Sequence, residues 1–105
     1  MDLSDLITRD AIVSPLKAAS KKQAIQTLAN RAADLTQFDA RKIFDTLLER
    51  EKLGSTGIGR GVAIPHGRMA GLDSLFGIFA RLDKPIGFEA SDDQPVDLIF
   101  LLLAP

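Results

Sequence analysis

The only histidine of the chain, His66, stands in a run of glycines and basic residues between positions 54 and 68. Imidazole is a competent nucleophile toward phosphorus, and arginine matches the oxygens of a phosphoryl group with paired, charge-assisted hydrogen bonds. Arg60 and Arg68 lie close to the histidine in the sequence, and Arg50 lies 16 positions before it. A histidine with neighbouring arginines therefore predicts phosphoryl-transfer chemistry.

The residues on either side of the histidine favour a presented side chain. Pro65 fixes the backbone and ends a strand, and Gly67 removes a side chain where a partner must approach. Residues 62–64 are apolar and predict a short buried strand, so we expect His66 at a strand end, where open α/β sheets bind their ligands. The alternative is a histidine that fills a half-buried position and satisfies its nitrogens locally.

Composition and spacing argue against several other kinds of site. The glycines at positions 57, 59 and 61 match neither the dinucleotide-binding pattern nor the P-loop, so nucleotide binding is not expected. One histidine and no cysteine cannot make a zinc site or a disulfide framework, and we expect no metal and no cofactor. A net charge of −1 provides no general attraction for nucleic acid or an anionic membrane.

Two segments resemble a known family. Residues 48–56, LEREKLGST, and residues 63–68, AIPHGR, are similar to the enzyme IIA domain of the mannitol/fructose type in the bacterial phosphoenolpyruvate-dependent phosphotransferase system. Within that family the chain is most similar, over its whole length, to the nitrogen-regulatory enzyme IIA. The resemblance implies that His66 is phosphorylated, at Nε2, and that Arg50 binds its phosphoryl group.

Four more residues are candidates for supporting the phosphoryl group. Ser55 and Thr56 carry hydroxyls that can donate to phosphoryl oxygens, Gly67 adjoins the histidine, and Arg68 adds positive charge. Each has an ordinary alternative, since loop hydroxyls often satisfy turn backbone and loop arginines are usually solvated. Arg68 is also placed to contact a partner protein, and Arg50 suits a helix C-terminus through the helix dipole.

Two amphipathic helices precede the histidine loop. Ser20 and Gln23 have the capping-box pattern, and apolar residues then recur with helical period over residues 21–34. Asp39 caps a second helix over residues 40–51, which Gly54 ends.

Strands dominate the rest of the chain. We expect a helical turn over residues 3–7, a brief strand over 11–13 ended by Ser14-Pro15, and a central strand over 75–82 broken by Asp83-Lys84-Pro85. Residues 86–88 form an extended piece, and residues 96–104 make the most hydrophobic strand, in the middle of the sheet. The predicted fold is α/β, with a mixed sheet mainly from residues 56–104 sandwiched by helices.

With 105 residues, the chain is expected to be one enzyme IIA-like domain over residues 1–105. Compared with the family, it lacks the C-terminal part that supplies closing helices and a second histidine near the active site, so we interpret the domain as incomplete at its C-terminus. The strand over residues 96–104 would then have one uncovered face, and pairing of two chains through it is a reasonable expectation.

The resemblance implies a phosphocarrier that takes a phosphoryl group from an HPr-like protein and regulates partner proteins, including potassium transport and sensor kinases. A sugar-specific enzyme IIA for fructose or mannitol is the alternative with the same chemistry. A protein-docking module without phosphotransfer is the alternative from another class, and a hydrolase is weaker because no nucleophile motif accompanies His66. The acidic N-terminus does not have the pattern of a signal peptide, so we expect a cytoplasmic protein.

Overall fold

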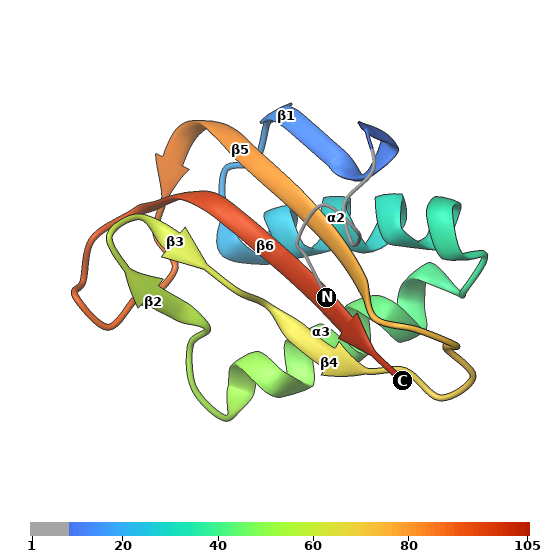
Figure 1. Cartoon of the computed structure of the whole chain (residues 1–105). Helices are drawn as coiled ribbons and strands as arrows, with labels where there is room; N and C mark the ends of the chain where they lie inside the picture. Colours follow the sequence, from blue (N-terminus) through green and yellow to red (C-terminus); the bar gives the residue numbers. More distant parts are fainter. Residues whose placement is uncertain (1–8) are drawn as a thin grey trace.

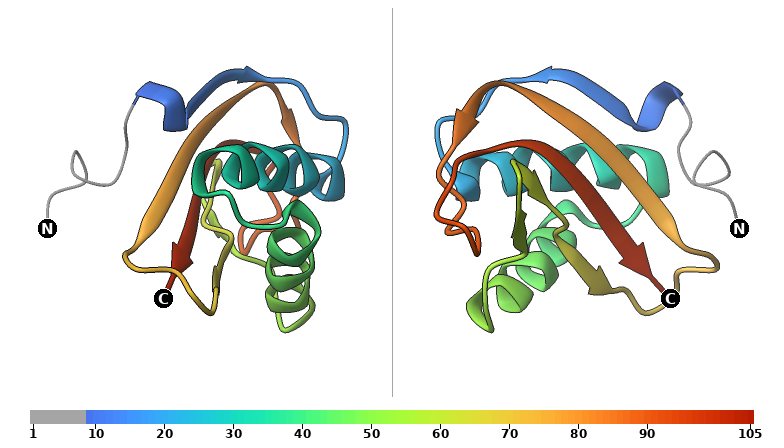
Figure 2. Two further views of the ribbon diagram at one scale, coloured as in Figure 1. Left: turned by 90° about the vertical axis from the view of Figure 1, so that its right-hand side faces the viewer. Right: turned by 60° about the vertical axis from the view of Figure 1, so that its left-hand side comes forward.

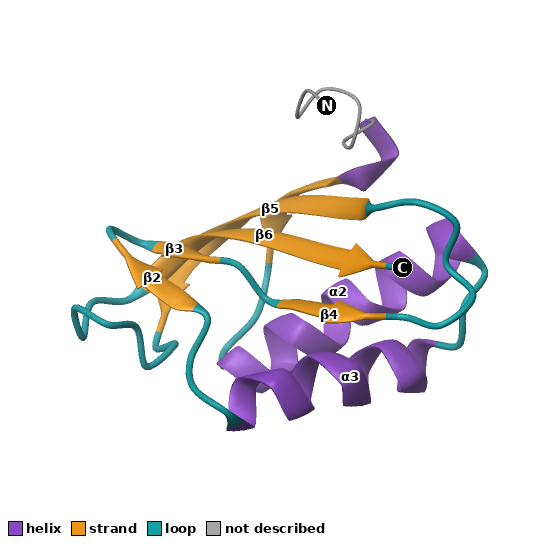
Figure 3. Ribbon diagram, turned by 60° about the horizontal axis from the view of Figure 1, so that its bottom comes forward, coloured by secondary structure: helices purple, strands orange, loops and turns teal. Residues whose placement is uncertain are grey.

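Two α-helices cover one face of a six-stranded mixed sheet in the computed structural model, which describes residues 9–105 (Figures 1 and 3). The helical turn expected over residues 3–7 lies outside the described residues. The elements follow the order η1 (Arg9–Ala11), β1 (Ile12–Leu16), α2 (Lys21–Thr36), α3 (Ala40–Lys52), β2 (Gly57–Gly59), β3 (Val62–Ala63), β4 (His66–Arg68), β5 (Phe76–Ile86) and β6 (Val96–Ala104).

Helix α2 begins as its capping pattern predicts. The hydroxyl of Ser20 accepts a hydrogen bond from the backbone N–H of Gln23, at 3.2 Å, and the Gln23 side chain accepts one from the N–H of Ala19, at 2.6 Å. The helix continues to Thr36, two residues beyond the predicted end, and Gln37 closes it in a left-handed conformation. Its buried face consists of alanines and two larger residues, Ala24, Ile25, Leu28, Ala29 and Ala32.

Helix α3 begins at the predicted cap, because the Asp39 carboxylate accepts from the N–H of Lys42 at 3.2 Å. Its buried positions recur at every fourth residue, at Ile43, Leu47 and Glu51. These three positions lie on one side of the helix, so the carboxylate of Glu51 is buried together with two aliphatic side chains.

Strand β6 is the middle of the sheet, as predicted. The strand order is β1-β5-β6-β3-β2, and β4 also pairs with β6. Strand β5 runs antiparallel to β6, whereas β3 and β4 run parallel to it, so the sheet is mixed. The predicted α/β class is confirmed, and both helices lie on the same face of the sheet (Figure 2).

Two strands continue past their predicted ends, and both contain proline. Strand β1 was expected over residues 11–13 but continues through Pro15 to Leu16. Among the described residues it is an edge strand that pairs with β5, and edge strands tolerate proline. The register shifts between Val13 and Leu16, around the proline.

Strand β5 also passes its predicted end. It was expected to break at residues 83–85 but continues through Pro85 to Ile86, which pairs with Val96 after a shift of register beyond Arg81. The irregular pairing accommodates the proline without ending the strand. Of the extended piece expected over residues 86–88, Ile86 belongs to β5, and Phe88 is fully buried.

Burial alternates along β6. Ile99, Leu101 and Leu103 are fully buried in the core with the helices, whereas Leu98, Phe100 and Leu102 are half-buried. On that second face the ring centroids of Phe100 and Phe79 lie 5.4 Å apart. In the described part of the chain, no helix has both the length and the apolar character needed to cross a membrane.

Helix α3 packs tightly on β4 at a glycine, Gly67, which generates a testable prediction. A Cβ on Gly67 would lie 2.6 Å from Cγ2 of Thr46, so Gly67→Ala should lower the free energy of unfolding by about 1–3 kcal/mol. Adding Thr46→Ser removes Cγ2 and should restore most of this loss, as measured by urea unfolding.

Gly87→Ala is the matched control, because a Cβ there meets nothing within 4 Å. Its stability should stay close to that of the wild type. If the effects of Gly67→Ala and Thr46→Ser on the free energy of unfolding were strictly additive, the predicted clash would be contradicted.

Candidate functional site

His66 begins a strand, which corrects the expectation that it ends one. Strand β3 stops at Ala63, one residue earlier than predicted, and β4 starts at His66 after Ile64 and Pro65. Pro65 has no N–H to donate, but its carbonyl accepts from the N–H of Leu102 at 2.9 Å. Pairing with β6 is therefore maintained across the gap, and the exposed His66 side chain lies at a fixed position along β6.

Both nitrogens of the imidazole have partners. The Nε–H of Arg50 donates to His66 Nε2 at 3.3 Å, and His66 Nδ1 lies 2.8 Å from the carbonyl oxygen of Ile64. Guanidinium groups only donate, so Nε2 accepts with its lone pair, and Nδ1 carries the hydrogen that binds the carbonyl. The geometry therefore selects the tautomer with the hydrogen on Nδ1 and the lone pair on Nε2.

Arg50 itself is held at the end of α3. It lies in the last turn of the helix, half-buried, and its Nη1 donates to the carbonyl oxygen of Gly54 at 2.9 Å. The spacing of 16 residues predicted from the sequence thus corresponds to a direct contact between Arg50 and His66. These two bonds use only part of the five N–H donors of a guanidinium. The planar set of donors of an arginine suits the oxygens of an oxyanion.

Glu51, beside Arg50 in the chain, occupies the interior. Its side chain is 4% exposed, and Oε2 lies 2.7 Å from Nζ of Lys21 and accepts from the N–H of Thr56 at 3.1 Å. The hydroxyl of Thr56 donates to Oε1 of the same carboxylate. Sequence reasoning missed Glu51 and Lys21, although the four-residue spacing from Ile43 and Leu47 places Glu51 on the buried stripe.

The two loop hydroxyls have protein partners in this conformation. Thr56 is buried and donates to Glu51, and Ser55 donates to the carbonyl of Phe88 at 2.6 Å. A hydroxyl has a single hydrogen, so donation to a phosphoryl oxygen requires these bonds to exchange. Support of a phosphoryl group by Ser55 and Thr56 stays a prediction on that condition.

The residues that follow His66 have different surroundings. Gly67 packs against Thr46 of α3, so the structure gives it a packing reason in addition to the expected access for a partner. Arg68 is exposed and lies two positions after His66 on β4, hence on the same side of that strand, about 7 Å along it.

Arg60 lies in the turn between β2 and β3 and is exposed, with φ of 57°. Its backbone N–H donates to the carboxylate of Asp92 at 2.9 Å, and the same carboxylate accepts from the N–H of Gln94 at 3.1 Å. Among the hydrogen bonds of residues 9–105, neither Arg60 nor Arg68 contacts His66. Of the arginines considered from the sequence, Arg50 is the one that binds the imidazole.

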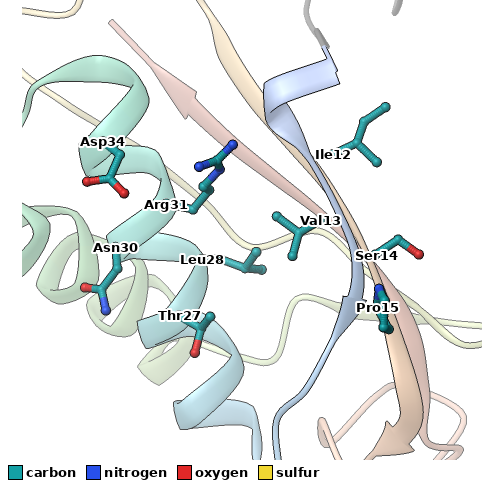
Figure 4. A pocket seen from close by; sticks show the side chains of 9 residues that line it. All are labelled: Ile12, Val13, Ser14, Pro15, Thr27, Leu28, Asn30, Arg31 and Asp34. Carbon is teal, nitrogen blue, oxygen red and sulfur yellow. The ribbon is translucent and has the colours of Figure 1, made fainter.

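A separate groove of about 480 Å³ lies between β1 and α2. Figure 4 shows Val13, Leu28 and Arg31 pointing into it. Arg31 donates through Nε and Nη2 to the carbonyl of Asp10, at 3.1 and 2.8 Å, so its guanidinium is engaged in holding η1, just before β1, near α2. Since β1 is the edge of the sheet farther from β3 and β2, this groove is distinct from the His66 site.

The fold and the site define an α/β domain that presents an unprotonated imidazole nitrogen beside an arginine at the end of a helix. A family model described as "Phosphoenolpyruvate-dependent sugar phosphotransferase system, EIIA 2" matches residues 5–105, and the chain belongs to this family. Membership supports a phosphocarrier of the EIIA type.

Comparison with individual proteins agrees with this assignment. The chain is 58% identical over 105 residues to a nitrogen regulatory protein of Bradyrhizobium diazoefficiens, and it covers 69% of that protein. The crystal structure of nitrogen regulatory protein IIA-Ntr from Neisseria meningitidis matches with a TM-score of 0.93 and 41% identity, over 98% of this chain and 70% of that one.

The crystal structure of IIA mannitol from Escherichia coli shares the fold, with a TM-score of 0.79 and 24% identity, over 93% of this chain and 71% of that one. The family match and the similarity to nitrogen regulatory proteins confirm the predicted resemblance.

The Asp92 turn generates a pH-dependent prediction. Hydrogen bonds from the backbone N–H of Arg60 and then of Gln94 lower the pKa of Asp92 below its ordinary value of 3.8. A carboxyl whose pKa is depressed by folding stabilises the fold above its unfolded pKa, and this contribution is lost as the pH falls through the folded pKa. Asp92→Asn should therefore be less stable than the wild type at pH 7, and the difference should shrink as the pH falls below 3.8.

Urea unfolding across this pH range measures the effect. Asp93→Asn removes one negative charge from the neighbouring position and controls for the change in net charge. A stability difference for Asp92→Asn that does not vary with pH would be at odds with the charge-assisted turn.

Proposed function

We propose that the chain is a phosphocarrier of a nitrogen-regulatory phosphotransferase system that accepts a phosphoryl group from an HPr-like protein on His66. The observation that carries the proposal is the bond from Arg50 Nε to His66 Nε2, at 3.3 Å, on an exposed imidazole. Similarity to the nitrogen regulatory protein of B. diazoefficiens and to IIA-Ntr of N. meningitidis supports the nitrogen-regulatory role.

In the proposed transfer, the lone pair of His66 Nε2 attacks the phosphorus of a phosphohistidine on the donor. A new N–P bond forms as the N–P bond of the donor breaks, and the bonding electrons leave on the donor imidazole. The hydrogen stays on Nδ1 and keeps its bond to the Ile64 carbonyl oxygen. This bond stabilises the positive charge that develops on the ring.

Arg50 has two successive roles in this proposal. Before transfer, its Nε–H holds the ring with Nε2 unprotonated. When phosphorus approaches, the guanidinium moves from the nitrogen lone pair to the phosphoryl oxygens, where its charge-assisted bonds are stronger. Arg68, on the same side of β4 as His66, adds positive charge for the phosphoryl group or for the donor protein.

Phosphorylation of His66 would change the charge of an exposed site and so decide which partner binds. The resemblance to nitrogen-regulatory proteins suggests partners in potassium transport and sensor kinases. The half-buried face of β6, with Phe100 against Phe79, offers a surface for pairing of two chains.

A sugar-specific enzyme IIA is the second candidate with the same chemistry, because the family description names a sugar phosphotransferase system. A docking module that never carries phosphate is the candidate from a different class. This candidate predicts that a partner binds equally well with and without a phosphodonor.

The acceptor is tested by incubating the chain with phosphoenolpyruvate, enzyme I and an HPr-type carrier. Intact mass should show one added phosphoryl group, labile to acid as a phosphoramidate is, and His66→Ala should lack it. The B. diazoefficiens relative serves as the positive control for the donor proteins.

An adduct that persists in His66→Ala would refute this acceptor. If the relative is labelled and the wild-type chain is not, the docking module becomes the better proposal.

The role of Arg50 is tested by Arg50→Lys. Lysine keeps the charge but not the planar set of donors, so the initial rate of phosphoryl acceptance should fall about tenfold or more. Arg41→Lys is the matched control, since Arg41 is an exposed arginine on the same helix, 4.0 Å from Asp45. Equal rates for the two variants would show that only the charge of Arg50 matters.

A further inference from the structure

The buried carboxylate next to Arg50 has no part in the transfer just described. We propose that Glu51 is a positioning residue, which fixes the tautomer and orientation of His66 through Thr56 and Ile64. This inference rests on the proposed acceptor role of His66 and adds a residue that acts on it from the interior.

A chain of hydrogen bonds joins Glu51 to the imidazole. The carboxylate accepts from both the N–H and the hydroxyl of Thr56. The carbonyl of Thr56 accepts from the N–H of Ile64 at 2.9 Å, and the carbonyl of Ile64 accepts from His66 Nδ1 at 2.8 Å. Each link is a short contact, so a change at the carboxylate is passed to the hydrogen-bond acceptor of Nδ1.

The other ring nitrogen is also positioned by a residue at this end of α3. Arg50 precedes Glu51 and contacts His66 Nε2, while its Nη1 holds the carbonyl of Gly54. The N–H of Gly54 donates in turn to the carbonyl of Glu51 at 3.1 Å. Both nitrogens of His66 are therefore positioned from the last turn of α3, one through Arg50 and the other through Glu51.

The donors around the Glu51 side chain match a carboxylate. Donors surround both oxygens, with Thr56 on each and Lys21 Nζ at 2.7 Å from Oε2. Lys21 is 18% exposed and also lies 4.9 Å from the centre of the Phe88 ring. A glutamine can place its one acceptor oxygen against Lys21 and the Thr56 N–H, but its NH₂ then replaces Oε1, which reverses the hydrogen bond with the Thr56 hydroxyl and removes the negative charge that pairs with Lys21. A residue needed only to fill space would tolerate that change.

The experiment compares Glu51→Gln with Ala32→Gly in the intact chain. Ala32→Gly destabilises α2 on its buried face and changes no residue of the hydrogen-bond chain to His66, so it reproduces a general loss of stability, matched by urea unfolding. Nitrogen-15 NMR of the His66 ring should show the Nδ1–H tautomer dominating in the wild type and in Ala32→Gly. In Glu51→Gln the tautomers should be mixed.

Phosphoryl acceptance from the HPr-type carrier is the second readout. Misplacement of the ring should slow Glu51→Gln about tenfold relative to Ala32→Gly. Thr56→Val keeps its N–H to Glu51 but loses the hydroxyl bond, so it should shift the tautomers in the same direction by less. It also tests the chain of bonds if Glu51→Gln fails to fold.

The outcomes separate the two proposals. Wild-type tautomers in the folded variants, together with acceptance at the rate of Ala32→Gly, would overturn the positioning role and leave the carrier role standing. A tautomer shift in a chain whose wild type accepts no phosphoryl group would support positioning by Glu51 and overturn the carrier role.

Discussion

The structure depends on parallel pairing of two very short strands with one long strand. Alone, β3 and β4 are too short to be stable, but β6 receives both, and the carbonyl of Pro65 keeps the pairing continuous between them. The register places His66 opposite Leu102. Since α3 packs on β4 at Gly67, the same arrangement brings Arg50 to the imidazole, and a glycine-rich segment acquires one defined side-chain geometry.

Sequence pattern predicted the helices and the central strand well, because their signals are local. The Ser20 and Asp39 caps and the apolar stripes of α2 and α3 are each contained within one element. The strand ends were harder to predict. Proline in a strand is judged by whether its N–H is needed, and that depends on which strand lies alongside, so β1 and β5 were ended too early at Pro15 and Pro85.

At the site, the family resemblance predicted that His66 and Arg50 act together. The structure shows that the two side chains are in contact. Composition could not show that the hydroxyls of Ser55 and Thr56 are engaged with Phe88 and Glu51, because those partners depend on tertiary packing. Glu51 was overlooked because a charged residue near a helix end is usually solvated. Its four-residue step from Leu47 was the available sign of burial.

The dependence of His66 on β6 also bears on the order of events during synthesis. His66 pairs with a residue 36 positions later in the chain, since Leu102 is its partner. A nascent chain that has exposed both helices and the histidine still lacks the strand that aligns β3 with β4. Arg50 and His66 therefore acquire their defined contact only once β6 is available to pair with both short strands.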